Sequence, residues 1–304
     1  MSPDPARHGQ AQRVLTQRIV NGIIAPDTSR PIPFDGFFPT GCALADFRQT
    51  RCLQCPTRPM HSETFSMDVI ATIRSCYSQR FGIPRQPGLV DSAVAAIEFE
   101  PTNDNELALR DLGSFSHLWV VFVFHGQNYS RFKPLVQPPR LGGKKTMGVY
   151  ATRSPNRPNP IGLSAVALRE VSFDKDRFRV LVDGGDFLDG TPVLDIKPYV
   201  PFVDAIPEAR SDWATQLQDG LKVNWTPEAL ERVQEIEPGC DLVATGSRGL
   251  QKLIEQTLAQ DPRPAYERGK DGKPGQHWGV LVGPVDVMFE VCQGCVIVVS
   301  IKHE

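Results

Sequence analysis

Short runs in which apolar and polar residues alternate fill the middle of the chain and predict β-strands. Residues 65–74 alternate through Met67, Val69, Ala71 and Ile73, the period of a strand with one buried face. Further strands are predicted at 94–100, 117–125, 146–152, 161–170, 178–182 and 191–197. The run at 117–125 is almost wholly apolar, so we expect it to be buried on both faces.

Glycine, proline and aspartate separate these short strands, a pattern typical of a closed or nearly closed β-barrel. No helices alternate with the strands, and the sequence lacks a Gly-x-Gly-x-x-Gly turn. Both features argue against a doubly wound nucleotide-binding sheet. The sequence therefore predicts a mainly β protein, with a single-sheet β-barrel over residues 63–202.

A second pattern begins after about residue 203. Thr226 followed by Pro227 is typical of a helix start, with an N-cap and a proline at the first helical position. Residues 285–301 suggest two strands around a Gln-Gly turn. Residues 247–260 predict an amphipathic helix, whose apolar face comprises Leu250, Leu253, Ile254, Thr257 and Leu258. We expect a small α+β domain over residues 203–304.

Residues 1–62 hold many prolines and polar residues without a sustained period, which predicts a flexible or poorly ordered extension. The 304 residues are 40% hydrophobic and 22% charged, as in a soluble globular protein. No apolar run is long enough to cross a bilayer, and the first thirty residues contain no continuous apolar block. Seven cysteines, an odd number, favour a reducing cytoplasm.

Two Cys-x-x-Cys pairs raise the question of a metal. Cys52 and Cys55, with Cys42 and His61 nearby, form the first pair, and Cys292 and Cys295 form the second. Such spacing suits zinc. The pairs lie at opposite ends of the chain, however, and the second fits two residues of a hairpin. We therefore expect no metal site.

Charge is distributed unevenly along a chain whose net charge is only −2. The window 112–169 contains no acidic residue, and its cations are Arg131, Lys133, Arg140, Lys144, Lys145, Arg153, Arg157 and Arg169. A segment of one sign is either a solvated face or the footprint of an anion such as RNA. Because apolar strands interrupt this run, its charges gather in loops and at strand ends, which favours a site.

The segment GVYATRSPNRPNPIGLSAV, residues 148–166, is the most unusual part of that window. In the predicted strand, Arg153 continues the apolar stripe of Met147, Val149 and Ala151. An arginine there needs an anion, either a ligand carboxylate or phosphate or an aspartate of the protein. Arg85 and Gln86 lie between two prolines in a second stiff, cationic stretch.

The segment DGTPVLDIKPYVP, residues 189–201, starts with a strong turn signal at Asp189-Gly190. Its alternation predicts a core face and an outer face. The core face comprises Pro192, Leu194, Ile196 and Val200, and the outer face comprises Thr191, Val193, Asp195, Lys197 and Tyr199. The acid, amine and phenol on the outer face suggest either chemistry or a structural ion pair.

Several of these motifs resemble, in order along the chain, the TrmO family of tRNA (adenine-N6)-methyltransferases. They are PRQPGLV, FSHLWVVFVFH, PPRLGG, GVYATRSPNRPNPIGLS, DGTPVLDIKPYVPF and DPRPAY. The likeness covers about residues 65–300 and leaves out the first 62. It implies a homodimeric β-barrel that binds S-adenosylmethionine without a Rossmann domain. It also implies methylation of N6 in the N6-threonylcarbamoyladenosine that lies beside the anticodon, in threonine tRNA in particular.

The resemblance also implies positions for the cofactor. They are Pro84, Arg85, Gln86, His125, Gly126, Arg153, Leu163, Asp189, Gly190, Thr191 and Pro192. The arginines suit the carboxylate of the cofactor, and Asp189 suits its ammonium. Asp195 and Tyr199 are candidates for the group that removes the N6 proton.

For the tRNA we expect contacts from Arg157, Asn159 and Lys197, and from Arg263 and Tyr266 of the DPRPAY motif. Methyl transfer from a sulfonium requires no metal, and positioning supplies much of the rate. Two other interpretations stay open from the sequence. One is a non-catalytic RNA-binding β-barrel, and the other is a metal-dependent module built on the Cys-x-x-Cys pairs.

Overall fold

A computed structural model of the chain describes residues 64–126, 132–139, 145–211, 214, 220–264 and 266–303. All of them belong to one unit, residues 64–304. The extension predicted at residues 1–62 and the first Cys-x-x-Cys pair lie outside the described residues. Within the described ranges no helix is long and apolar enough to cross a membrane.

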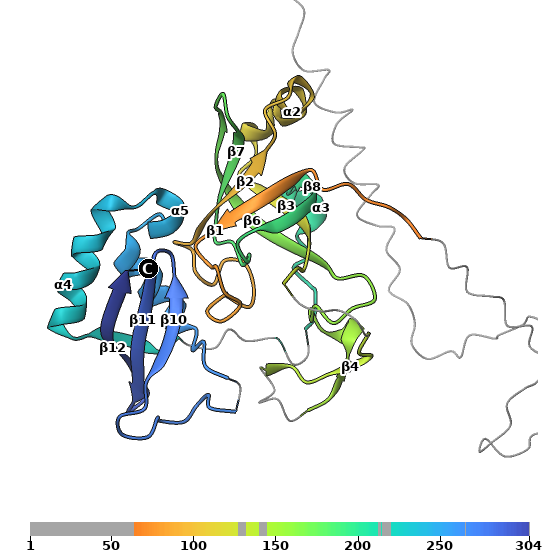
Figure 1. Cartoon of the computed structure of the whole chain (residues 1–304). Coiled ribbons are helices and arrows are strands. Elements are labelled where there is room, and N and C mark those ends of the chain that lie inside the picture. The colour runs from red at the N-terminus through yellow and green to blue at the C-terminus, as the bar shows by residue number, and fades with distance from the viewer. Residues whose placement is uncertain are drawn as a thin grey trace, which may run out of the picture. The chain divides into compact units, whose positions relative to one another are not determined.

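Six strands form a closed barrel in the order β1-β2-β7-β6-β3-β8 (Figure 1). They are β1 (Ala71–Ser75), β2 (Val94–Phe99), β3 (His117–Val123), β6 (Ile161–Phe173), β7 (Phe178–Asp183) and β8 (Thr191–Pro198). Every neighbouring pair is antiparallel. The mainly β fold and the barrel are thus confirmed.

The barrel interior is filled by alternate residues of each strand. In β3 the inward residues Leu118, Val120 and Phe122 are buried, whereas the residues between them are only half-buried. The prediction that this strand is buried on both faces was therefore wrong, because a closed antiparallel barrel gives each strand one inner and one outer face. Gly162 in β6 packs under the Phe122 ring, where a Cβ atom would overlap the ring carbons.

The predicted faces of β8 also need correction. Val193 is fully buried in the barrel core, and Leu194 is not. The register with β3 shifts here, since Val121 lies opposite Asp195 and Phe122 opposite Val193. This β-bulge inserts one residue into β8. The inward-facing residues are therefore odd-numbered before the bulge, as at Val193, and even-numbered after it, as at Ile196. Simple alternation could not reveal the change of phase.

Two predicted strands are shorter than expected. Strand β1 begins only at Ala71, and Met67 and Val69 are 61% and 56% exposed. In place of the strand at 146–152 the chain forms β5 (Met147–Gly148), paired with β4 (Leu135–Val136), and then the 3-10 turn η4 (Val149–Ala151). The apolar stripe that Arg153 was expected to continue therefore does not exist. Among the described residues, this region also contains the short elements α2 (Asn103–Leu109), η2 (Leu112–Ser114) and α3 (Pro201–Asp204).

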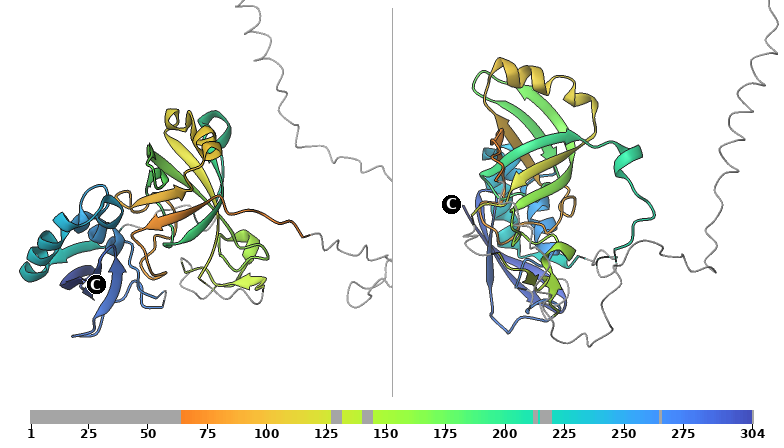
Figure 2. Two further views of the ribbon diagram at one scale, coloured as in Figure 1. Left: turned by 45° about the horizontal axis from the view of Figure 1, so that its top comes forward. Right: turned by 90° about the vertical axis from the view of Figure 1, so that its right-hand side faces the viewer.

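The described residues of the C-terminal part form a four-stranded sheet and three α-helices (Figures 1 and 2). The strands are β9 (Lys222–Trp225), β10 (Trp278–Val282), β11 (Val285–Cys292) and β12 (Cys295–His303), in the order β10-β11-β12-β9, with β9 parallel to β12. The helices are α4 (Pro227–Ile236), α5 (Leu242–Thr245) and α6 (Leu250–Ala259), with a 3-10 turn η6 (Glu237–Gly239) after α4. This is the α+β arrangement that the sequence predicts.

Local signals in this part were accurate. Thr226 caps α4, because its side chain accepts a hydrogen bond from the Ala229 N–H at 3.3 Å. All five apolar-face residues predicted for α6 are buried. Cys292 and Cys295 lie opposite each other at the end of the β11–β12 hairpin, and both are free thiols. The interpretation of this pair as hairpin residues is confirmed.

The connection between β1 and β2, residues 76–93, joins the barrel to the C-terminal core. Its buried residues Cys76, Tyr77, Val90 and Ala93 pack in one apolar cluster with α4, α6 and the C-terminal strands. Burial raises the pKa of the Cys76 thiol to about 12, so this thiol stays protonated and acts as a small apolar side chain. The connection is therefore part of two structures, the barrel and the C-terminal core.

Candidate active site

The positions expected to bind a cofactor gather at one end of the barrel, which we call the mouth. Strands β1, β3 and β7 end there, and β2 and β8 begin there. The connection at 76–93 supplies Pro84, Arg85 and Gln86, and the end of β3 leads to His125 and Gly126. The loop before β6 supplies Arg153, β6 supplies Leu163, and the β7–β8 turn supplies Asp189–Pro192. Segments up to about a hundred residues apart in sequence thus meet at the mouth.

Arg153 contacts the connection across the mouth. Its Nη1 donates a hydrogen bond to Oε1 of Gln86, and Nε2 of Gln86 donates to the Arg85 carbonyl. Because Gln86 is held at both ends of its amide, the two stiff cationic stretches seen in the sequence are linked. Arg153 is still exposed, so its guanidinium keeps donors for a ligand.

The turn at Asp189 is fixed to the end of β1. Its Oδ1 accepts a hydrogen bond from the Ser75 N–H at 2.8 Å, and Gly190 donates its N–H to the Ile73 carbonyl at 2.8 Å. Gly190 has φ +76°, a left-handed conformation that favours glycine. His125 lies over this turn, with Nε2 3.0 Å from the Asp189 carbonyl oxygen and Nδ1 3.2 Å from Oγ1 of Thr191.

Asp186 is a member of this cluster that sequence reasoning missed. Its Oδ1 accepts a hydrogen bond from Oγ of Ser164, an inward residue of β6, at 2.6 Å. Burial raises the pKa of Asp186 to about 6, although the Ser164 bond and the nearby charge of Arg153 oppose the rise. A carboxyl with a pKa near neutrality beside the other mouth residues is suited to proton transfer. The only sequence signal was its position three residues before Asp189.

Arg157 and Asn159 lie in the same proline-rich loop but differ in their surroundings. Nη1 of Arg157 donates to the Thr152 carbonyl at 2.8 Å, and the guanidinium lies over the Tyr150 ring, 5.6 Å from its centroid. Arg157 therefore holds the loop in shape from within. Asn159 is exposed, so its amide remains accessible to a substrate.

The outer face of β8 carries Asp195 and Lys197, and Tyr199 comes directly after the strand. All three lie farther from the mouth than Thr191. Asp195 and Lys197 form an ion pair at 2.7 Å, the structural alternative considered from the sequence. Tyr199 packs on the Trp119 ring and donates its backbone N–H to the His117 carbonyl, at the opposite end of β3 from His125. Eight residues of extended chain separate Tyr199 from Thr191, roughly 26 Å. Within one copy of the chain, this placement does not support a role for Tyr199 in the reaction.

The DPRPAY segment, residues 261–266, also differs from expectation. Arg263 is only 2% exposed. Its Nε and Nη2 donate to the two carboxylate oxygens of Asp261 at 2.8 and 2.9 Å, and Nη1 donates to the Lys270 carbonyl. Its guanidinium also lies over the Trp278 ring. Arg263 is thus not a surface cation for RNA phosphates, whereas Tyr266 is 70% exposed.

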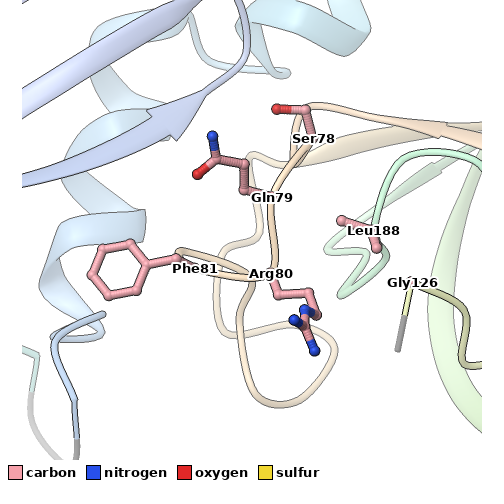
Figure 3. Close-up of a pocket in the computed structure, with 6 residues that line it drawn as sticks. All are labelled: Ser78, Gln79, Arg80, Phe81, Gly126 and Leu188. Carbon is pink, nitrogen blue, oxygen red and sulfur yellow. The ribbon is translucent and has the colours of Figure 1, made fainter. Parts of the chain in front are cut away.

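A hollow of about 700 Å³ adjoins the mouth, between the connection 76–93 and the barrel (Figure 3). Ser78, Gln79, Arg80, Phe81, Gly126 and Leu188 line it. Gly126 is one of the expected cofactor positions, and Leu188 directly precedes Asp189. Among the described residues, no group of three or more His, Cys, Asp or Glu side chains has the arrangement to hold a metal ion.

Comparisons with known proteins agree with this architecture. A family model described as the tRNA-methyltransferase O N-terminal domain matches residues 72–205, and the TrmO C-terminal domain model matches residues 218–304. The closed barrel with its α+β partner thus places the protein in the class of β-barrel tRNA-methyltransferases. Because the two matches together span more than half of the chain, the chain belongs to the TrmO family.

Individual relatives support this assignment. The chain is 42% identical over 229 residues to the tRNA (adenine(37)-N6)-methyltransferase of Escherichia coli K12, covering 75% of this chain and 94% of the relative. It is 44% identical over 224 residues to a putative S-adenosylmethionine-dependent methyltransferase, RcsF, of Pseudomonas aeruginosa, covering 74% and 91%. A crystal structure of TrmO from Pseudomonas aeruginosa superposes with a TM-score of 0.64 at 35% identity, covering 81% and 100%.

Proposed function

We propose that this protein methylates N6 of the N6-threonylcarbamoyladenosine beside the anticodon of tRNA, threonine tRNA in particular, with S-adenosylmethionine as the methyl donor. The observation that carries the proposal is the meeting of two hydrogen-bonded pairs at the mouth, Arg153 with Gln86 and His125 with Asp189. The relatives named as adenine(37)-N6 and S-adenosylmethionine-dependent methyltransferases support it.

The mouth residues fit the groups of this cofactor. Asp189 uses one carboxylate oxygen to accept from the Ser75 N–H and has its second oxygen for an ammonium. Arg153 has donors beyond its contact with Gln86 and suits a carboxylate, because a guanidinium fork matches two oxygens. Backbone groups near Gly126 and Leu163, which is 53% exposed, suit the edge of an adenine.

When bound, S-adenosylmethionine supplies a methyl group on a sulfonium sulfur. Transfer of that methyl group to N6 would require removal of the N6 proton. The chain contributes mainly by holding N6 in line with the methyl group. Of the carboxylates considered, Asp186 is the one we assign to the N6 proton, because its pKa is near 6 and Asp195 is paired with Lys197.

The RNA contacts are proposed on the surface beside the mouth and on the C-terminal part. Asn159 and Tyr266 are exposed, and an exposed tyrosine provides a stacking surface for an unpaired base of an anticodon loop. Arg157 acts through the shape of the loop 149–159. The C-terminal residues 203–304 are proposed to contact the tRNA, and Tyr266 is the residue that tests this.

We further propose that the protein works as a homodimer in the cytoplasm. Apolar side chains after β8 are strongly exposed: Phe202 is 88%, Val203 62% and Ile206 65% exposed. A patch of this kind is typical of a surface that another chain covers. Sedimentation equilibrium of the purified protein tests the dimer, and Phe202→Asp should shift the population to monomer. A monomer at all concentrations would contradict it.

Two experiments test the proposed activity. Nucleoside mass spectrometry of tRNA from cells that lack the protein should show N6-threonylcarbamoyladenosine where wild-type cells contain its N6-methyl derivative. Purified protein should transfer a labelled methyl group from S-adenosylmethionine to threonine tRNA that carries the modification. Binding of tRNA without binding of S-adenosylmethionine would instead indicate a non-catalytic RNA-binding barrel.

A further inference from the structure

Among the described residues Arg80 has no polar partner, which distinguishes it from Arg153 and Arg157. It lies in the connection 76–93, is exposed, and lines the hollow beside Gly126 and Leu188. In the part of the chain that the structure describes, its guanidinium forms no hydrogen bond or ion pair. Arg153 and Arg157, by contrast, donate to Gln86 and to loop carbonyls, respectively.

The direction of the Arg80 side chain is visible in Figure 3. Phe81 points toward the C-terminal part, where it packs against the apolar cluster. Arg80, the preceding residue, points to the other side, toward Gly126 and the barrel. A guanidinium offers five N–H donors in a planar fork. The side of the hollow that faces the mouth therefore presents unused donors for an oxyanion.

The backbone on both sides of Arg80 is held firmly. Cys76 accepts a hydrogen bond from the Gly283 N–H at 2.7 Å, and the Tyr77 hydroxyl is 3.2 Å from Oγ1 of Thr257. At the far end, the N–H of Ser92 donates to Oε1 of Gln256 at 3.0 Å. Both ends of the connection are bound to the C-terminal part. The connection therefore loses little conformational entropy when a ligand binds.

We propose that Arg80 binds the carboxylate of the threonylcarbamoyl group on the substrate adenine, and so selects the modified nucleotide. This inference rests on the proposed function. In that substrate the carbamoyl group is attached to N6 itself, so its threonine carboxylate lies within a few bonds of the atom that receives the methyl group. The hollow beside the mouth suits this carboxylate, because its guanidinium pairs with no residue that the structure describes, whereas Arg153 is assigned to the carboxylate of the cofactor.

The test uses the full chain and two forms of threonine tRNA, one with N6-threonylcarbamoyladenosine and one with unmodified adenosine at the same position. Arg80→Ala should weaken binding of the modified tRNA by about 10- to 100-fold, the size expected for a charge-assisted contact. Binding of the unmodified tRNA should stay within about twofold. Arg80→Lys, which keeps the charge but loses the fork, should fall between wild type and Arg80→Ala.

Arg110→Ala is the matched control, because Arg110 is an exposed arginine after α2, at the opposite end of the barrel from the mouth. It should bind both tRNAs like the wild type. Circular dichroism checks that every variant is folded, and calorimetry measures the affinity for S-adenosylmethionine, which Arg80→Ala should leave unchanged.

Three results would overturn the inference. If Arg80→Ala weakens binding of both tRNAs equally, Arg80 binds a backbone phosphate. If the variant loses affinity for S-adenosylmethionine, Arg80 binds the cofactor carboxylate. If neither affinity changes, Arg80 is a solvated cation. The wild-type protein separates this inference from the proposed function. If wild type does not methylate the modified tRNA, the proposed function fails. If it does, and Arg80→Ala does not discriminate the two tRNAs, only the assignment of Arg80 fails.

Discussion

Arg80 and Arg263 are arginines in different parts of the chain and have opposite surroundings. Arg263 follows a helix end in the proline-rich segment 261–266, is almost fully buried, and has a bidentate aspartate, a carbonyl and an indole ring as partners. Arg80 is exposed beside a hollow and pairs with no described residue. Arg263, which belongs to a family motif, therefore stabilises the fold. Arg80, which lies outside the motifs, faces the site.

The difference shows what decides the role of an arginine. A buried guanidinium must satisfy its donors within the protein, because an unpaired buried charge is costly. An exposed guanidinium bears no such requirement and stays free for a ligand. Residue type is the same at both positions, so burial and partners separate the two roles.

Arg263→Ala should have the largest effect, on folding. It leaves Asp261, whose side chain is 13% exposed, without its partner, and breaking a buried ion pair costs roughly 3–5 kcal/mol. Urea denaturation measures this loss. Arg248→Ala is the control, since Arg248 pairs with Asp91 on the surface with both side chains about half exposed, and it should cost under about 1 kcal/mol. Equal losses for the two variants would erase the distinction drawn between buried and exposed arginines.

Asp186→Asn should change how stability depends on pH. Because the pKa of Asp186 is about 6 in the folded chain and about 4 when unfolded, the folded chain holds the extra proton between these values. The contribution of this carboxyl to the stability of the wild type should therefore fall as pH rises from about 4 to 6, by about 3 kcal/mol, and then level off.

The measurement for Asp186 is urea denaturation of wild type and Asp186→Asn across pH 3.5 to 8. The difference between the two proteins isolates this carboxyl from other titrating groups. Parallel curves would show that the carboxyl is better solvated than its burial indicates. If Asp186 also accepts the N6 proton, the variant should lose methyl transfer while binding S-adenosylmethionine.

Arg153→Ala tests the exposed arginine that has a protein contact. Its side chain is accessible, so the variant should stay folded, and loss of a bidentate contact to a carboxylate should weaken S-adenosylmethionine binding by roughly 1.5–3 kcal/mol. Calorimetry measures the affinity, with Arg110→Ala as the control. Unchanged affinity would leave the contact with Gln86 as the whole role of Arg153.

Tyr266→Ala should have the smallest effect of these variants, and the effect should be on tRNA affinity. It tests the exposed tyrosine of the segment 261–266 separately from the buried Arg263. If the ring stacks on a base, tRNA affinity falls by about 1–3 kcal/mol, with stability and S-adenosylmethionine affinity unchanged. Tyr266→Phe keeps the stacking surface and should bind like the wild type. Because a stacking loss carries no charge, the slope of affinity against salt concentration should stay the same. Equal tRNA affinity for wild type and Tyr266→Ala would contradict the role.

Local patterns were sufficient for much of the fold. The barrel strands were found from short alternating or apolar runs, α4 from Thr226 and Pro227, α6 from its apolar face, and the last hairpin from its Gln-Gly turn. These features depend on residues near one another in sequence, and the physical rules that govern them act over a few positions. The family motifs likewise located the mouth residues, since each motif is a local string.

Tertiary structure decided the features that depend on distant partners. The bulge in β8 arises from its register with β3, which no single strand encodes. The pKa of Asp186 depends on burial beside Ser164 and Arg153, which come from other elements. The burial of Arg263 and the exposure of Arg80 follow from how α6, Trp278 and the connection 76–93 pack. Sequence thus determined the elements and the set of charged residues, and packing determined which of those charges are left for a ligand.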